Sequence, residues 1–274
     1  MRARGERWLL GLLAMLLVLF SLSPFLWFAL TSLKSQIEVT AMPPTCWPSG
    51  SLDFYRAVFG RHDLLHFVGN SLVVAGATTI ITMAFATGAA YALARLPLRP
   101  KGLIMGALLL VSMFPQISLA GPVWRILGGL GWLNTYQGLI LPYVTLTLPL
   151  GVWVLTSFFR ELPRELEDAA LSDGCTRWQA LRWVMLPLAA PGVFTAAILV
   201  FVYAWNEFFF ALLIMTQRQY QTLPVGVALF QGQYTMPWGE IAAASTVATL
   251  PLVLLVLLFQ KRIVRGLSAG AVKG

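Results

Sequence analysis

The sequence predicts an all-α polytopic membrane protein with six transmembrane helices and with both termini in the cytoplasm. Of its 274 residues, 58% are hydrophobic and only 11% are charged, whereas a soluble domain carries about 25% charged residues. Six apolar runs are long enough to cross about 30 Å of hydrocarbon at about 1.5 Å per residue. The net charge of +8 is spread over alternate connections between these runs, which is typical of membrane loops and not of a nucleic-acid-binding patch.

The expected spans, in chain order, are residues 9–31, 66–95, 102–125, 138–160, 188–213 and 241–259. The first span follows three arginines, as the core of a secretory signal peptide would. Its apolar stretch nevertheless continues from Leu9 to Leu30, and no small-residue cleavage site follows before Lys34. We therefore expect an uncleaved helix that crosses the membrane.

The basic residues predict which side of the bilayer each connection occupies. Fourteen of the 19 lysines and arginines fall on one side: Arg2, Arg4, Arg7, Arg95, Arg99, Lys101, Arg160, Arg164, Arg177, Arg182, Lys261, Arg262, Arg265 and Lys273. The other side has Lys34, Arg56, Arg61, Arg125 and Arg218. Because an excess of Lys and Arg marks cytoplasmic loops, both termini and the connection 160–187 are predicted to be cytoplasmic. Cys46 and Cys175 then lie on opposite sides of the membrane, so we expect no disulfide.

Residues 160–187, here called the insert, form the long polar connection between the fourth and fifth spans. Their pattern predicts two short amphipathic helices joined at a glycine. Pro163 suits a first helical turn, and acidic residues follow it where the helix dipole favours them. Gly174 ends the first helix because glycine tolerates positive φ, and Thr176 with Gln179 forms a capping box for the second.

Both helices of the insert have an expected apolar side. The residues that recur on these sides are Leu162, Leu166, Ala169 and Ala170 in the first helix and Trp178, Leu181 and Met185 in the second. Pro187 is expected to end the second helix before the next span. Such a segment could be a cytoplasmic knob on which a partner docks, or a pair of amphipathic helices that lies on the lipid headgroups. The residue pattern alone leaves both interpretations open.

The spacing within the insert resembles the EAA signature of ABC importer permeases. Asp168-Ala169-Ala170 is followed after three residues by Gly174, and after nine more by Val184-Met185-Leu186-Pro187. One departure from the family pattern is Asp168, which stands where the family usually has Glu, although Glu167 precedes it. The resemblance implies a set of ATPase-coupling residues: Glu167, Asp168, Ala169, Ala170, Gly174, Leu186 and Pro187.

Two further segments are similar to the smaller membrane subunit of carbohydrate importers of the maltose type. They are WNEFFFALLI at 205–214 and GLSAGAVKG at 266–274. The resemblance implies the ABC transmembrane type-1 fold for residues 66–259, with 160–187 as the cytoplasmic coupling loop. Residues 1–65 are then an N-terminal transmembrane helix with the first outer loop, and residues 260–274 are a cytoplasmic tail.

The family resemblance also implies what the chain assembles with. In such importers the EAA loop is seated in a cleft of an ATPase subunit, and closure of two ATPases switches the permeases between inward-open and outward-open states. The expected partners are a second permease subunit, two ATP-binding subunits and an extracytoplasmic sugar-binding protein, in the plasma (inner) membrane of a prokaryote. The chain has no G-x-x-x-x-G-K-[ST] loop to cradle phosphates, so we expect ATP and Mg to be bound by the partner ATPase and no cofactor in this chain.

Catalytic patterns are not found in the sequence, so we expect a transport subunit and not an enzyme. It has no paired carboxylates in a predicted pocket, no nucleophile with a base and no H-E-x-x-H. The expected function is ATP-driven import of a sugar, such as a disaccharide or an oligosaccharide. An ion-coupled secondary transporter and a permease for a non-sugar solute are the alternatives. The former needs ionisable residues near mid-membrane, commonly in repeated halves, and no such repeat is visible.

Glu207 is the most informative charged residue within a predicted span. A carboxylate at membrane depth costs about 2.5–3.5 kcal/mol on insertion scales, so it should face protein or water. With Tyr203, Trp205 and Asn206 it could line a sugar route, because aromatic rings stack on sugar CH faces and amides and carboxylates bond hydroxyls. Alternatively, Asn206 and Glu207 hold neighbouring helices together or lie near the outer interface.

The outer connection between the fifth and sixth predicted spans, residues 215–240, corresponds by resemblance to a loop that meets the sugar-binding protein. Gly232, Tyr234 and Trp238 are the candidate contacts, or they form part of an aromatic belt at the interface. His62 and His66 are four residues apart in the first outer loop. No further ligand is near them in the sequence, so we expect no metal site.

Overall fold

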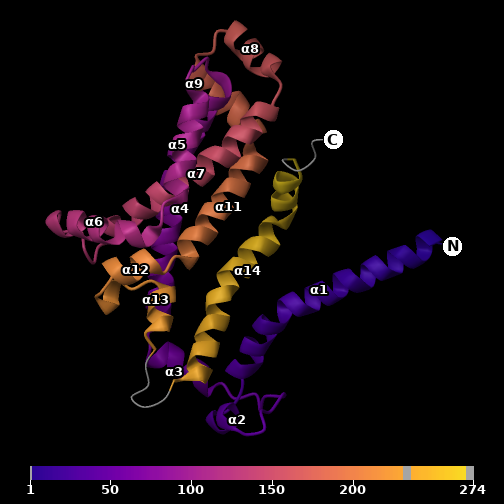
Figure 1. The fold of residues 1–274 in the computed structure, drawn as a ribbon, viewed down its shortest axis with the longest axis vertical. Coiled ribbons are helices and arrows are strands. Elements are labelled where there is room, and N and C mark those ends of the chain that lie inside the picture. Colours follow the sequence, from indigo (N-terminus) through magenta and orange to yellow (C-terminus); the bar gives the residue numbers. More distant parts are fainter. Residues whose placement is uncertain (1, 231–235, 270–274) are drawn as a thin grey trace. The chain divides into compact units, whose positions relative to one another are not determined.

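The computed structural model describes residues 2–230 and 236–269, with the side chains of residues 8–230 and 236–260. All regular elements in these ranges are helices (Figure 1), which confirms the predicted all-α class. The chain divides into two compact units. The first contains Met1–Leu65 and Gly226–Pro251, and the second contains His66–Val225 and Leu252–Gly274.

The first unit begins with a long helix that is apolar on all sides. Its elements are α1 (Arg2–Ser32), α2 (Gln36–Thr40), α3 (Asp53–Gly60) and the first part of α14 (Trp238–Ala269). The side chains of α1 are exposed from Trp8 to Phe28. An apolar helix of this length without a polar face is suited to a surrounding of lipid or of other membrane helices.

Polar contacts hold the segment that follows α1. Lys34 is buried, and its ammonium group donates a hydrogen bond to the carbonyl of Thr45 at 2.6 Å. Ser35 and Glu38 form a capping box at the start of α2. Hydrogen bonds from the Ser35 N–H and the Ser49 hydroxyl stabilise the ionised carboxylate and hold the pKa of Glu38 below its usual value. The segment between α1 and α3 therefore has a defined conformation of its own.

The second unit contains most of α4 (Leu64–Arg95) and the helices that pack around it. These are α5 (Lys101–Met113), α6 (Gln116–Gly129), α7 (Tyr136–Glu161), α8 (Arg164–Ser172), α9 (Arg177–Ala180), the π-helix η1 (Leu181–Met185), α10 (Leu186–Leu188), α11 (Ala190–Asn206), α12 (Phe209–Ile214) and the 3-10 helix η2 (Arg218–Tyr220). A last short helix, α13 (Leu223–Ala228), begins in this unit and ends in the first.

The core of the second unit lies where α4, α7 and α11 meet (Figure 1). Small side chains on α4 and α7 let these helices approach closely: a Cβ added at Gly151 would lie only 3.1 Å from the Cβ of Ala86. Phe159, near the C-terminal end of α7, is fully buried. The hydroxyls of Thr82 and Thr147 hydrogen-bond each other at 2.9 Å between the same two helices. Close packing and a polar bond together join α4 to α7 within the membrane region.

Among the described residues, four helices are long and apolar enough to cross a membrane: Trp8–Ser32, Leu64–Arg95, Tyr136–Glu161 and Trp238–Gln260. They match four of the predicted spans. The other two predicted spans, 102–125 and 188–213, are not continuous helices. In their place are two bent pairs, Lys101–Met113 with Gln116–Gly129 at 90° and Arg177–Leu188 with Ala190–Asn206 at 80°. The total is six if each bent pair is one span.

A proline explains the bend in the first pair. Phe114 has an extended backbone, with φ −69° and ψ 132°, because the ring of Pro115 disfavours helical geometry in the residue before it. Helix α5 therefore ends, and α6 begins at Gln116 in a new direction. Proline also has no backbone N–H to donate. The break therefore places polar backbone carbonyl and amide groups within the predicted span 102–125.

The second bent pair turns at Ala189, which has ψ 1° and is followed by α11. The helix before it, Arg177–Leu188, ends one residue after Pro187, close to the predicted end. Helix α11 then ends at Asn206 and not at residue 213. Glu207 is extended, with ψ 129°, and a new helix, α12, follows.

Candidate functional site

The insert folds as two short helices around a turn, as predicted. Helix α8 begins after Pro163, which is its N-cap residue. Gly174 has a φ of +87°, a conformation that favours glycine. Thr176 and Gln179 form the predicted capping box, with hydrogen bonds of 2.7 Å and 3.3 Å between side chain and backbone. Local signals therefore produce the helix–turn–helix shape of the insert.

The residues of α8 divide between a buried and an exposed face. Glu167 and Ala170 are buried, whereas Leu166, Asp168 and Ala169 are exposed. The residues of the predicted apolar side therefore divide, since Ala170 packs inward whereas Leu166 and Ala169 face outward. Glu167 takes the inward position because its carboxylate meets polar side chains of α4.

The second helix of the insert is divided in the same way. Leu181 and Met185 are buried in the core of the second unit. Trp178, which was predicted to share their apolar face, is instead 66% exposed, and Trp183 is 62% exposed. Two indole rings thus project from a helix whose other side is packed. Of the remaining predicted coupling residues, Leu186 is half-buried and Pro187 is exposed.

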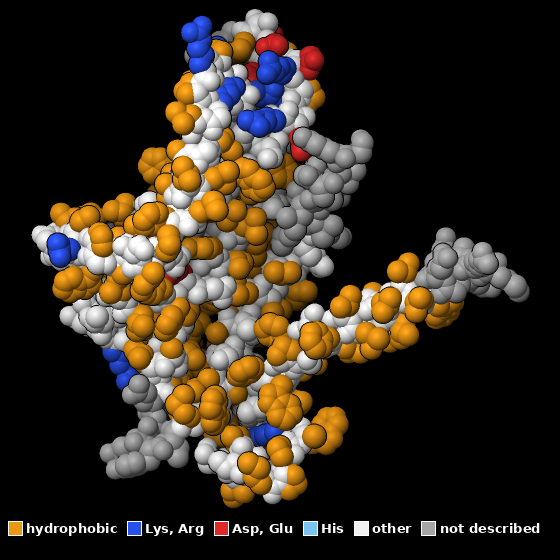
Figure 2. All heavy atoms as spheres, in the orientation of Figure 1, with side chains coloured by type: hydrophobic (Ala, Val, Ile, Leu, Met, Phe, Trp, Pro, Cys, Tyr) orange, Lys and Arg blue, Asp and Glu red, His pale blue; other side chains and the backbone are white. Residues whose placement is uncertain are grey.

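Basic side chains gather over α8 and α9, at the top of the view in Figure 2. Arg160, Arg164, Arg177 and Arg182 are all exposed there. We call the outward side chains of this region the exposed insert surface, consisting of Leu166, Asp168, Ala169, Trp178 and Trp183. Large apolar side chains and positive charge are thus exposed on the same helices of the insert.

Glu207 is buried, with 8% of its surface exposed. Its carboxylate accepts hydrogen bonds from the Tyr143 hydroxyl, from the N–H of Phe210 at 3.0 Å and from the N–H of Ala211 at 3.2 Å. It therefore joins α7 to the first turn of α12. Trp205 is also buried and stacks on Phe201 with ring centres 5.7 Å apart. Glu207 thus makes contacts between helices, and the Trp205 contact lies within α11.

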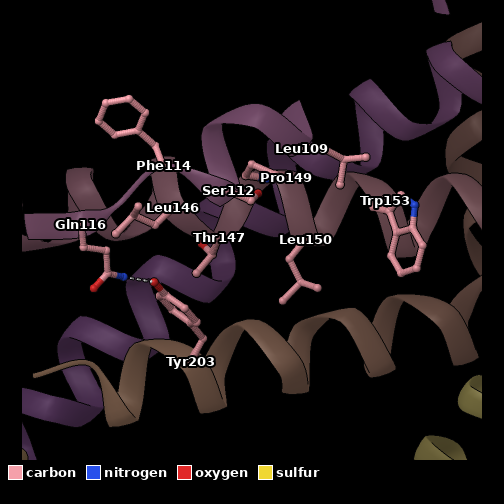
Figure 3. Close-up of a pocket in the computed structure, with 10 residues that line it drawn as sticks. All are labelled: Leu109, Ser112, Phe114, Gln116, Leu146, Thr147, Pro149, Leu150, Trp153 and Tyr203. Atoms are coloured by element: carbon pink, nitrogen blue, oxygen red, sulfur yellow. Dashed lines mark hydrogen bonds between the residues drawn. The ribbon is translucent and has the colours of Figure 1, made fainter. Parts of the chain in front are cut away.

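Tyr203 and Asn206 face cavities. A cavity of about 270 Å³ lies between α5, α7 and α11 (Figure 3). At one end of it the amide of Gln116 donates a hydrogen bond to the Tyr203 hydroxyl at 2.6 Å, and Trp153 lines the other end. A more open hollow shares Gln116 and Tyr203 and adds Asn206 and Glu207. Gln116 is not among the residues predicted from the sequence, and its position directly after Pro115 is the signal that could have identified it.

Two asparagines that the sequence analysis also missed fasten the segment after α12. The Asn70 amide donates to the carbonyls of Gln219 at 3.0 Å and Gln221 at 2.8 Å. Asn134 accepts from the N–H of Gln217 at 2.7 Å and hydrogen-bonds the Thr216 hydroxyl. The first part of the outer connection 215–240 is therefore held by α4 and by the turn before α7.

The predicted contacts further along this connection are only partly described. Gly232 and Tyr234 lie outside the described residues, and Trp238 is 59% exposed at the first residue of α14. His62 lies 2.6 Å from a Glu240 carboxylate oxygen, whereas His66 bonds the carbonyl of Gln219. In the described part of the chain no group of three His, Cys, Asp or Glu is placed to hold a metal ion.

Comparison with known proteins identifies the family. Residues 84–269 match the family described as binding-protein-dependent transport system inner membrane component. The chain is 43% identical to the trehalose/maltose transport system permease protein MalG of Thermococcus litoralis, over 98% of both chains. It is 45% identical to the trehalose transport system permease protein SugB of Mycobacterium tuberculosis, over 99% of this chain and 98% of that one. It is also 45% identical to the sulfoquinovosyl glycerol transport system permease protein SmoH of Agrobacterium fabrum, over 95% and 92% of the two chains.

The fold has a counterpart among solved structures. It is similar to that of a chain in the crystal structure of a bacterial ABC transporter that imports the acidic polysaccharide alginate, with a TM-score of 0.79 and 19% identity over 94% of this chain and 96% of that one. This confirms the predicted permease fold. The chain therefore belongs to the family of binding-protein-dependent transport system inner membrane components, as a permease subunit of an ABC importer and not as an enzyme.

Proposed function

We propose that this permease imports a disaccharide or a short oligosaccharide. The relatives with 43–45% identity are named for transport of trehalose, maltose or a sulfoquinovosyl glycerol. The cavities at Tyr203 offer what a sugar requires, namely aromatic rings for its CH faces and amide and hydroxyl groups for its own hydroxyls. In this proposal Tyr203 and Asn206 contact the sugar, while Trp205 and Glu207 keep the lining helices in place.

We further propose that an ATP-binding subunit docks on the insert and drives transport through it. The coupling residues are those implied by the family pattern, Glu167, Asp168, Ala169, Ala170, Gly174, Leu186 and Pro187. In this proposal the exposed Asp168 and Ala169 contact the ATP-binding subunit, whereas the buried Glu167 and Ala170 support α8 from inside the permease. The observation that carries this proposal is the exposure of Leu166 and Trp178 on helices whose opposite sides are buried in the protein core. Force applied to such a surface is transmitted to the membrane helices, because the helices that bear it cannot move alone.

The proposed assembly contains a second permease, two ATP-binding subunits and an extracytoplasmic sugar-binding protein. ATP and Mg belong to the ATP-binding subunits. The sugar-binding protein would meet the outer connection 215–240, where Trp238 is exposed and the preceding segment is fastened by Asn70 and Asn134. Gly232 and Tyr234 remain candidate contacts in the same connection.

Reconstitution of the copurified complex in proteoliposomes tests the function. We expect ATP hydrolysis that is stimulated by the sugar-loaded binding protein, with uptake that requires ATP. Uptake by this chain alone, driven by a proton or sodium gradient, would instead support a secondary transporter. Asn206→Ala and Tyr203→Phe should reduce uptake without preventing assembly.

Docking on the insert is tested by a single added charge. Ala169→Glu places a carboxylate in the middle of the exposed insert surface and should prevent copurification of the ATP-binding subunit. Thr40→Glu is the matched control, since it adds the same charge to an exposed position of α2 in the first unit. Retention of the ATP-binding subunit by Ala169→Glu would contradict the docking proposal.

A further inference from the structure

We infer that Glu167 is a positioning residue, which fastens the insert to the end of α4 through Tyr91 and Arg95. Its role in this inference is to set the orientation of α8 from within the permease, and not to contact the ATP-binding subunit. The inference rests on the proposed function of residues 160–187 as the coupling loop.

Two side chains from one face of α4 hold the insert at two points. The Tyr91 hydroxyl donates a hydrogen bond to the Glu167 carboxylate at 2.5 Å, and the Arg95 Nε lies 3.5 Å from the other carboxylate oxygen. The same guanidinium donates to the carbonyl of Leu162 at 2.6 Å. Because Leu162 directly follows α7 and Glu167 lies within α8, these contacts span the joint between the two helices.

The burial of Glu167 shows that these contacts are specific. Glu165 and Asp168, the other acids of α8, are exposed, as expected for a polar surface helix. Glu167 is only 8% exposed, and the Arg95 side chain is 4% exposed. Removing two charges from water is costly unless they meet each other and further hydrogen bonds. A carboxylate in this position therefore indicates a contact that the fold requires.

A polar anchor of this kind fixes the rotation of α8 about its own axis. Successive residues of a helix point about 100° apart, as follows from about 3.6 residues per turn. With Glu167 held inward, Asp168 and Ala169 must face outward. Apolar contacts alone tolerate sliding, whereas a hydrogen bond has a narrow range of angles. Tyr91 is itself held, because its ring packs edge-on against Phe159 with centres 6.0 Å apart.

Tyr91→Phe and Glu167→Gln test the inference in the complete complex. The first removes only a hydroxyl and keeps the ring packing, and the second keeps the size of the side chain but removes its charge. Tyr55→Phe is the matched control, since it removes a tyrosine hydroxyl that hydrogen-bonds Ser32 at 2.8 Å in the first unit. We expect both test variants to copurify with the ATP-binding subunit and to hydrolyse ATP.

The informative readout is the amount of sugar moved per ATP hydrolysed. We expect it to fall about tenfold in both test variants, since a hydrogen bond to a charged group is worth at least about that factor. The double variant should lose less than the sum of the two single variants, because both changes act on contacts of the same Glu167 carboxylate. A purely structural role would lower the yield of complex and leave the ratio of sugar to ATP unchanged.

The alkylation rate of Cys175 measures how firmly the insert is held against the rest of the permease. It follows Gly174 in the turn between α8 and α9, and Cys46→Ser leaves it as the single thiol of the chain. Loss of the anchor should raise the rate of its alkylation about tenfold in Tyr91→Phe and Glu167→Gln, but not in Tyr55→Phe.

The outcomes separate this inference from the function on which it rests. The inference is overturned if both test variants keep the wild-type ratio of sugar to ATP and the wild-type alkylation rate of Cys175. Loss of docking in Ala169→Glu would then leave the docking proposal intact. Additive losses in the double variant would also overturn it. Normal docking and transport by Ala169→Glu would overturn both.

Discussion

Replacing Glu207 by alanine should destabilise the permease in a way that distinguishes a helix clamp from a substrate contact. The variant leaves the buried N–H groups of Phe210 and Ala211 without their acceptor. It also removes the carboxylate partner of the Tyr143 hydroxyl, which keeps only the longer contact of 3.4 Å with the Glu207 backbone carbonyl. These donors belong to α7 and to the first turn of α12. The expected effect is therefore loss of stability at the break that follows α11.

The size of the effect follows from the three hydrogen bonds. Polar bonds in membrane proteins contribute about 0.6 kcal/mol on average and up to about 1.7 kcal/mol each. Three of them give about 2–5 kcal/mol. At about 2–4 °C per kcal/mol for a chain of this size class, the midpoint of thermal unfolding should fall by at least about 4 °C. It can be measured on the detergent-solubilised complex at a fixed heating rate.

Two further variants make the result decisive. Glu207→Gln keeps one acceptor oxygen and should lose about half as much stability. Asn206→Ala is the neighbouring control, because the Asn206 amide is exposed and donates to the Val202 carbonyl of its own helix. It should leave the midpoint unchanged. A Glu207→Ala complex with the wild-type midpoint but no transport would refute the clamp and assign Glu207 to the sugar route.

Three further predictions concern the insert, the topology and the core. Gly174→Pro should leave the complex assembled but uncouple ATP hydrolysis from uptake, because proline requires a φ near −65° and this turn has +87°; normal uptake would count against the coupling role. In inside-out vesicles an impermeant maleimide should label Cys175 and not Cys46, and the reverse pattern would invert the proposed orientation. Gly192→Ala should cost about 1–3 kcal/mol, because its Cβ would meet the Phe158 ring. Gly88→Ala meets no atom within 4 Å and should be neutral or slightly stabilising, so equal unfolding midpoints in these two variants would contradict the packing described here.

The shape of the insert could be predicted from sequence because its determinants are local. A glycine with positive φ at Gly174 and a capping box at Thr176 each act within four residues. The faces of its helices could not be predicted, because Glu167 turns inward toward Tyr91, which is 76 residues away in the chain. Amphipathic periodicity assigns the inward side to apolar groups, and here a polar group takes that position.

In the membrane helices, too, the sequence alone does not show which prolines interrupt a helix. Pro115 separates α5 from α6, whereas Pro122, Pro142 and Pro149 lie inside helices that continue through them. Each removes one backbone donor, and neighbouring helices decide whether the freed carbonyl is satisfied without a break. The prolines therefore mark where a helix can break, but which of them interrupts a span depends on tertiary packing, and here it is Pro115, at the 90° bend between α5 and α6.

In the second unit, α7 and α11 are joined at one end by the insert and at the other by a hydrogen bond. This arrangement explains how force on the insert reaches the cavities. Helix α7 leads into the insert at Leu162, and the insert leads into α11 through the bend at Ala189. The two helices pack against each other along the core and are joined again at their far ends by the hydrogen bond between Tyr143 and Glu207. Movement of the insert must therefore shift α7 and α11 together or break that bond. Because Tyr203 lies on α11 one turn before Glu207, any such shift changes the cavity that Tyr203 and Gln116 line.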